Sequence, residues 1–89
     1  MSSDSRTGSA EVTERLARSA ILGLLAERNA GATICPSEAA RRVGGENWRG
    51  AMAAVHAAAT ALDAEGSVRL CQRGKAVARP VGAYRIGRA

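Results

Sequence analysis

Apolar residues recur at helical spacing over residues 10–28, and charged residues occupy the positions between them. The apolar positions are Val12, Leu16, Ala17, Ile21, Leu24 and Leu25. A stripe of this kind is typical of an amphipathic helix that packs one face against a core. The helix is expected to end at residues 29–31, because Asn29 and Gly31 favour turns and left-handed backbone. Thr33 and Ile34, both β-branched, then predict a short strand.

The segment ICPSEAARRVG carries the start signals of a second helix. Pro36 suits the first helical position, Cys35 would be the N-cap, and Glu38 falls where a capping-box acid reaches back. Gly44 and Gly45 are expected to end this helix after about two turns.

A third and more regular helix is predicted from Asn47, as its N-cap, to Glu65, with Gly66 beyond its end. Its core stripe consists of Trp48, Met52, Val55, Ala59 and Leu62. Its outward face is expected to carry Arg49, Ala53, His56, Thr60 and Asp63. The place of Trp48 in the core stripe favours burial over stacking on bases, for which Tyr84 is the other aromatic candidate.

The apolar period changes to two after the third helix, which predicts strands. Val68 and Leu70 begin the alternation, a turn follows at residues 72–75, and a return run comes after it. Pro80 and Gly82 interrupt the return run, so the second strand is expected to be bulged or short. The pattern indicates a hairpin with a basic tip.

The element order is helix, short strand, short helix, long helix and hairpin, which matches an α+β winged helix-turn-helix domain. In such a domain three helices accompany a small antiparallel sheet, here expected to have three strands, and the hairpin is the wing. The alternative is a three-helix bundle with a disordered tail, which leaves the apolar alternation after residue 66 unexplained. The 89 residues fit one winged-helix domain over residues 10–89, and polar residues 1–9 predict a disordered N-terminal tail.

Positive charge is concentrated at the C-terminal end of the chain. Residues 66–89 hold no acid, so their basic residues account for the whole net charge of +5. These residues are Arg69, Arg73, Lys75, Arg79, Arg85 and Arg88. An uncompensated basic segment is an electrostatic footprint for a polyanion, most often nucleic acid. A solubilising surface without a ligand is the plainer interpretation.

In a winged helix-turn-helix domain the recognition helix enters the major groove and the wing contacts phosphates. The sequence therefore predicts a nucleic-acid-binding protein, with double-stranded DNA as the expected partner and transcriptional regulation as a role it could serve. The candidate contact residues are Arg41, Arg42, Arg49, His56, Arg69, Arg73, Lys75 and Arg79. Phosphate contacts should dominate, because the outward face of the third helix holds few side chains that pair with base edges. A protein-docking module of the same fold is the alternative, with a protein partner.

Cys35, Cys71 and His56 raise a third possibility, a thiol- or metal-responsive regulator. Cys35 is the candidate thiol sensor, since a helix N-terminus stabilises a thiolate. The three residues are too widely spaced for a typical zinc site, so no metal and no cofactor is expected. No catalytic constellation or phosphate loop is present in the sequence, so we do not expect an enzyme.

The N-terminal segment lacks a cationic stretch followed by an apolar one, and no apolar run approaches the roughly 20 residues that span a bilayer. We therefore expect a cytoplasmic protein with no membrane partner, whose two cysteines are reduced thiols.

Four sequence blocks resemble a small bacterial family of domains of unknown function. They are residues 34–41 (ICPSEAAR), residues 48–52 (WRGAM), residues 72–74 (QRG) and residues 82–86 (GAYRI). The resemblance covers nearly everything after the N-terminal tail, and it implies a winged-helix-like fold and no known activity. The chain departs from the family pattern at His56, where members tend to have Arg or Lys, and at Ala83, where they tend to have Pro. The first departure weakens the expectation of a phosphate contact from the middle of the third helix.

Overall fold

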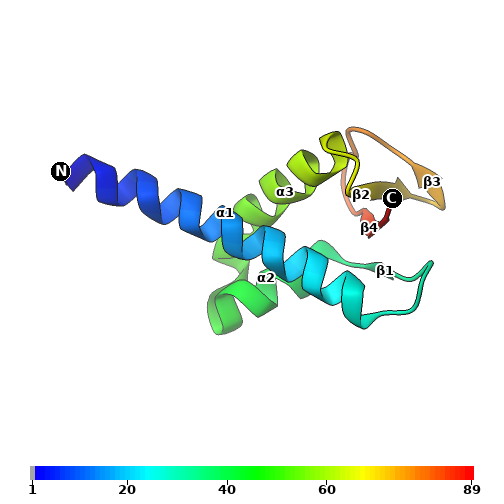
Figure 1. The fold of residues 1–89 in the computed structure, drawn as a ribbon, viewed down its shortest axis with the longest axis horizontal. Helices are drawn as coiled ribbons and strands as arrows, with labels where there is room; N and C mark the ends of the chain where they lie inside the picture. The colour runs from blue at the N-terminus through cyan, green and yellow to red at the C-terminus, as the bar shows by residue number, and fades with distance from the viewer. Residues whose placement is uncertain (1) are drawn as a thin grey trace.

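The computed structural model describes the backbone of residues 2–89 and the side chains from Thr13 onward. In chain order the elements are α1 (Ser2–Glu27), β1 (Thr33–Ile34), α2 (Pro36–Gly44), the 3-10 turn η1 (Gly45–Asn47), α3 (Trp48–Ala64), β2 (Val68–Gln72), β3 (Lys75–Ala76) and β4 (Arg85–Arg88) (Figure 1). The fold is therefore α+β, as expected from the sequence. The expected disordered tail, residues 1–9, lies before the first described side chain and stays a prediction.

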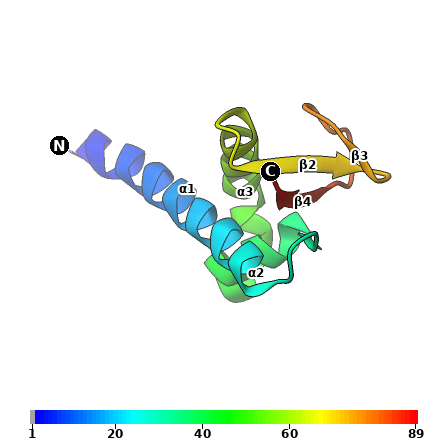
Figure 2. The same ribbon diagram turned by 45° about the vertical axis from the view of Figure 1, so that its right-hand side comes forward.

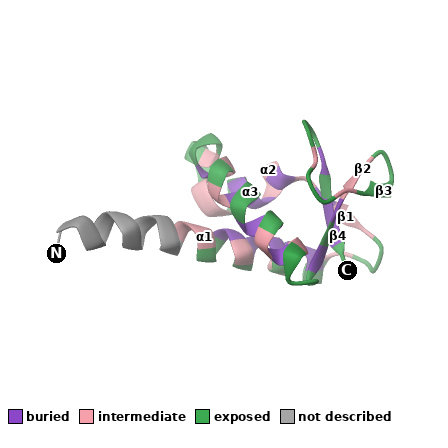
Figure 3. Ribbon diagram, turned by 90° about the horizontal axis from the view of Figure 1, so that it is seen from above, coloured by how far each residue is buried: buried purple, intermediate pink, exposed green. Residues whose placement is uncertain are grey.

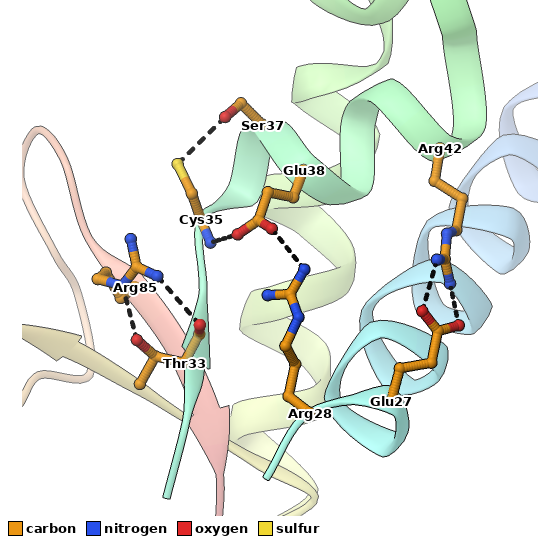
Figure 4. Close-up of polar contacts among 8 residues, drawn as sticks. All are labelled: Glu27, Arg28, Thr33, Cys35, Ser37, Glu38, Arg42 and Arg85. Carbon is orange, nitrogen blue, oxygen red and sulfur yellow. Dashed lines mark hydrogen bonds and ion pairs between the residues drawn. The ribbon is translucent and has the colours of Figure 1, made fainter.

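The start of α2 lies where its sequence signals place it. Cys35 is the N-cap residue, with extended backbone, and Pro36 is the first helical residue. The Glu38 side chain returns to the helix start, where its Oε2 accepts a hydrogen bond of 2.7 Å from the Cys35 N–H (Figure 4). The predicted reach of Glu38 back to the N-cap is confirmed, and it satisfies a backbone donor just before the helix.

We expect Glu38→Gln to lower the free energy of unfolding by about 1 kcal/mol near neutral pH. Hydrogen bonds, first from the Cys35 N–H and then from Arg28, hold the pKa of Glu38 below its usual value. A carboxylate with a lowered folded-state pKa stabilises the fold above its unfolded-state pKa, about 4.3. This contribution is lost as the pH falls through the folded-state pKa, so urea unfolding should separate wild type and variant at about pH 7 and less at about pH 3.

Glu46→Gln is the matched control for this measurement. Glu46 is exposed and bonds no other residue that the structure describes, so its variant should follow the wild type at both pH values. A difference between Glu38→Gln and wild type that does not shrink in acid would contradict an electrostatic origin.

The C-terminal end of α3 has the hydrogen bonds of a Schellman motif. The N–H of Ser67 donates to the Leu62 carbonyl at 2.9 Å, and the N–H of Gly66 donates to the Asp63 carbonyl at 3.0 Å. Gly66 has a φ of 82°, a conformation that glycine adopts without steric cost. The predicted limits of this helix are confirmed, with Asn47 as N-cap and Glu65 as C-cap.

The strands form one antiparallel sheet in the order β1-β4-β2-β3. The expectation of three strands is wrong, because the loop of residues 77–84 divides the return run into β3 and β4. Pro80, which lacks a backbone N–H, and Gly82, with a φ of 80°, lie in this loop. The turn before β3 consists of Arg73 and Gly74, both with positive φ (53° and 79°), as a two-residue hairpin turn requires.

The core lies between the helices and the sheet, and it is rich in alanine (Figure 3). Its largest fully buried side chains are Ile21, Ile34, Val55, Leu62, Val68, Leu70 and Ile86. Ala39 and Ala40 on α2 and Ala51 on α3 are also buried, which lets these helices approach closely. Leu16, which the sequence placed on the inward stripe of α1, is instead 51% exposed, because the buried stripe is centred on residues 17, 21 and 24 and Leu16 lies at its edge.

Ion pairs and a helix cap hold α1 against the rest of the domain. The pairs are Arg18–Glu65, Arg28–Glu38 and Arg42–Glu27, with N···O distances of 2.7, 2.8 and 2.9 Å. At the end of α1, Nη2 of Arg88 donates to the carbonyls of Leu25 (2.6 Å) and Arg28 (3.1 Å). Carbonyls at this position lack partners within a helix, so Arg88 closes the C-terminal end of α1.

Candidate nucleic-acid interface

Two arginines lie against the indole ring of Trp48 at the start of α3. The guanidinium carbon of Arg41 lies 4.9 Å from the ring centroid and that of Arg49 lies 4.7 Å from it. Trp48 was expected in the core but is only half-buried, since it begins the helix at the edge of the domain. Cation–π contacts of this length stabilise an arginine at a chosen place without neutralising its charge. Trp48 therefore presents two cations beside the N-terminal end of α3.

The outward face of α3 is the one predicted from the sequence. Arg49, Ala53, His56 and Thr60 are all exposed. Arg49 and His56 are two turns apart on the same side, a separation of about 10 Å along the axis. The Thr60 hydroxyl donates to the His56 carbonyl at 2.9 Å, so its proton is already used within the helix. Arg49 and His56 are thus the residues of this face that can donate to a ligand.

A buried tyrosine supports His56 from the C-terminal segment. His56 Nδ1 lies 2.6 Å from the Tyr84 hydroxyl, and the ring centroids are 5.5 Å apart. Tyr84 is 8% exposed, and burial, with a smaller effect from Cys35, raises its pKa to about 12. Stacking of Tyr84 on bases, one option from the sequence, does not fit this burial. Its contact with His56 was missed, because the two residues belong to elements far apart in the chain.

The loop of residues 77–84 brings Arg79 to the same face of α3. Figure 1 shows this loop, in orange, returning from β3 toward the C-terminal half of α3. Between them lies a groove of about 400 Å³, lined by His56 and Thr60 from α3 and by Arg79, Pro80 and Tyr84 among the loop residues. The groove therefore joins the outward face of α3 to a cation of the C-terminal segment.

The hairpin carries two more exposed cations, Arg73 in its turn and Lys75 at the start of β3. Figure 2 shows β2 leading from the C-terminal end of α3 to this turn, with β4 beside it. Nε2 of Gln72, at the end of β2, donates to the carbonyls of Val81 (2.6 Å) and Ala83 (2.9 Å). These bonds fix the loop of residues 77–84 to the hairpin, so the turn and the loop form one basic unit.

Two predicted contact residues, Arg42 and Arg69, belong neither to the groove beside His56 nor to the hairpin turn. Arg42 reaches α1, where both of its terminal nitrogens bond the Glu27 carboxylate at 2.9 Å (Figure 4). A Cβ on Gly23 would lie 3.3 Å from Nη1 of Arg42, so a glycine at this position leaves room for the Arg42 side chain to lie across α1. Arg69 is exposed, but it lies on the face of β2 opposite the buried Val68 and Leu70. Arg42 is thus paired with an acid, whereas Arg69 lines a hollow with Ala76, Val77 and Ala78.

The structure uses two of the six C-terminal cations internally. Arg88 closes the end of α1, and Arg85 donates to Oγ1 (2.6 Å) and the carbonyl (3.0 Å) of Thr33 (Figure 4). Of the other four, Arg69 lies on the outer face of β2, and Arg73, Lys75 and Arg79 lie on the hairpin and the loop beside α3. These last three and the two arginines on Trp48 are called the interface cations: Arg41, Arg49, Arg73, Lys75 and Arg79. None of them forms an ion pair with an acid in the part of the chain whose side chains are described.

Cys35, the candidate thiol sensor, is partly buried and free, as is Cys71. Its Sγ accepts a hydrogen bond of 3.1 Å from the Ser37 hydroxyl (Figure 4). Among residues 13–89 no group of three or more potential ligands could hold a metal ion. The structure thus places Cys35 at the N-cap, and a sensing role stays a prediction.

The model of a family described as a protein of unknown function (DUF3253) matches residues 14–89. No curated protein matches the chain. No helix in the described part is both long enough and apolar enough to cross a membrane. The resemblance of the sequence to a small family of unknown function is confirmed.

Proposed function

The chain belongs to the DUF3253 family of proteins of unknown function, and we propose that it is a winged-helix protein that binds double-stranded DNA mainly through phosphate contacts. The element order supports the fold assignment: α2 and α3 are joined by a short turn, and a β2–β3 hairpin follows α3. β1 lies beside the last strand and ties the hairpin to the helices. In this assignment α3 is the recognition helix and the hairpin with residues 77–84 is the wing.

The observation that carries the proposal is the distribution of unpaired cations. The ion pairs between described residues all fasten α1, whereas the interface cations lie at the start of α3, on the hairpin and on the loop beside α3. Arg41 and Arg49, held on one indole ring with no acid paired to either, repel each other, and a polyanion removes this repulsion while it releases counterions. A merely solubilising surface does not require two arginines to be stacked on one indole ring.

The small side chains of α3 favour close approach over base recognition. Ala53 and Ala57 are exposed between Arg49 and Thr60, so the helix can lie near a groove floor. Strong discrimination between bases relies on bidentate donors such as Arg, Asn or Gln, and Arg49 is the one residue of this type on the described outward face. We therefore propose phosphate-dominated binding with weak sequence preference.

A titration with a short mixed-sequence DNA duplex at several salt concentrations tests this function. With one phosphate for each of the five interface cations, log K should fall with log salt with a slope of about 4 to 5. Fluorescence anisotropy of labelled duplex gives both affinity and slope. No binding at low salt, or an affinity that does not change with salt, would contradict the proposal.

Docking of a protein partner is the second candidate function. Leu16 is half-exposed and lines a hollow of about 250 Å³ with Ala20 and Val43, on the α1 and α2 side of the domain. An apolar patch of this kind is a common feature of protein contacts. It becomes the leading candidate if the duplex titration shows no binding.

A further inference from the structure

The hydrogen bond between Tyr84 and His56 fixes where a neutral imidazole carries its proton. The Tyr84 hydroxyl has one proton, which it keeps at neutral pH because its pKa is raised to about 12. Its one hydrogen-bond partner among the described residues is His56 Nδ1, 2.6 Å away. If the hydroxyl donates, Nδ1 is the acceptor, and the proton of the neutral ring must lie on Nε2.

His56 lines the groove between α3 and the loop of residues 77–84, and its second ring nitrogen, Nε2, is not used by Tyr84. The two nitrogens point in nearly opposite directions, so Nε2 points away from Tyr84, and it bonds no other described residue. The proton of the Thr60 hydroxyl is used by the His56 carbonyl. The side-chain donors left in the groove lining are therefore His56 Nε2–H and the guanidinium of Arg79.

We propose that Tyr84 is a positioning residue that holds neutral His56 in the Nε2–H form, and that His56 and Arg79 together bind one backbone phosphate in this groove. The proposal rests on the proposed DNA binding and names the contact made by the middle of α3. The groove lining includes the Arg79 cation and no acid, which suits a phosphate oxygen better than a base edge. Pro80, also in the lining, offers an apolar surface for the neighbouring sugar.

Two substitutions of His56 separate the two nitrogens. Gln places an amide N–H near the position of Nε2, whereas Asn places it near Nδ1 and leaves the groove without the donor. We expect His56→Asn to lower duplex affinity about tenfold, and His56→Gln to stay within about threefold of wild type. Arg79→Gln should also lower affinity, and its effect should be smaller when His56 is already Asn, because the two residues share one phosphate. Equal losses for the Asn and Gln variants would overturn the proposal.

A measurement on the free protein tests the tautomer itself. Long-range proton–nitrogen NMR spectra of ¹⁵N-histidine-labelled protein, recorded where His56 is neutral, should show Nδ1 without a proton and Nε2 with one. Tyr84→Phe removes a single oxygen and should admit the second tautomer, with thermal unfolding as the check that the fold is retained. A wild-type spectrum with the proton on Nδ1 would contradict the role of Tyr84.

The two experiments distinguish a failure of the proposed DNA binding from a failure of the proposed phosphate contact. If the duplex does not bind the wild type at low salt, DNA binding itself is wrong, whatever the tautomer. If the duplex binds with the expected salt slope while His56→Asn and His56→Gln behave alike, the shared phosphate is wrong and DNA binding stands.

Discussion

Neutralising Arg73, Lys75 and Arg79 together, each to Gln, is expected to lower duplex affinity on the order of a hundredfold at about 0.1 M salt. Each phosphate contact contributes nearly one unit to the salt slope, so the slope should fall by about 2.7. All three residues are exposed, and none bonds another residue that the structure describes, so the fold should be unaffected. Anisotropy titrations at several salt concentrations measure both quantities.

A second triple variant controls for net charge. Arg15, Arg18 and Arg42, on α1 and α2, are changed to Gln, which removes the same three charges outside the proposed interface. The exposed ion pairs that this variant loses contribute little to stability. The slope of log K against log salt should remain near that of the wild type, apart from a small loss of long-range electrostatic attraction. Equal losses in the two variants would mean that the DNA responds to net charge alone and that the wing is not the contact.

The sequence predicted those parts of the fold that are determined by residues close by in the chain, such as helix caps and turns. The limits of α3 follow from Asn47 and Gly66, and the start of α2 follows from Pro36 and Glu38. Each of these signals acts within one turn of the helix it limits, so no knowledge of the tertiary fold is needed. The hairpin turn at Arg73 and Gly74 was found for the same reason.

The contacts that the sequence could not predict join residues far apart in the chain. Arg18 pairs with Glu65 across 47 positions, and Arg88 caps α1 at Leu25 across 63 positions. Charge counting treats every arginine alike, so it could not separate Arg42, held by Glu27, from Arg73, which is unpaired among the described residues. The interruption of the return strand was predicted from Pro80 and Gly82, but the contact that holds it was not: Gln72 binds the loop of residues 77–84 through two of its carbonyls.

The sequence predicted one part of the candidate site, the outward face of α3, and missed another, the surroundings of Trp48. The outward face of α3 follows from helical periodicity, so Arg49 and His56 were placed correctly. Trp48 has the same periodicity as the core stripe, but burial also depends on what covers each end of a helix. At the start of α3 two arginine side chains cover Trp48, and no pattern in the sequence indicated that Arg41 and Arg49 would share one ring.

Replacing Ile86 by Ala is expected to lower the free energy of unfolding by about 3 kcal/mol. Ile86 is fully buried on β4, the strand that lies between β1 and β2, and it is paired with Ile34 on one side and Leu70 on the other. Shortening the Ile86 side chain leaves a cavity where β1, β4 and β2 meet the core. The nearby alanines are too short to fill this cavity. In a domain of this size the loss is a large part of the total stability, so the thermal midpoint should fall by roughly 10 °C or more.

Val81→Ala is the matched control, because it also shortens an aliphatic side chain but at a position that is 89% exposed. Its free energy of unfolding should stay within about 0.5 kcal/mol of wild type in urea. At a temperature where Ile86→Ala remains folded, its duplex affinity should equal that of the wild type, since none of the interface cations lies on β4. On this result the sheet supports the proposed wing, and the stability of the sheet and the proposed DNA contacts can be changed separately. Similar unfolding midpoints for the two variants would show that β4 does not hold the hairpin to the helices.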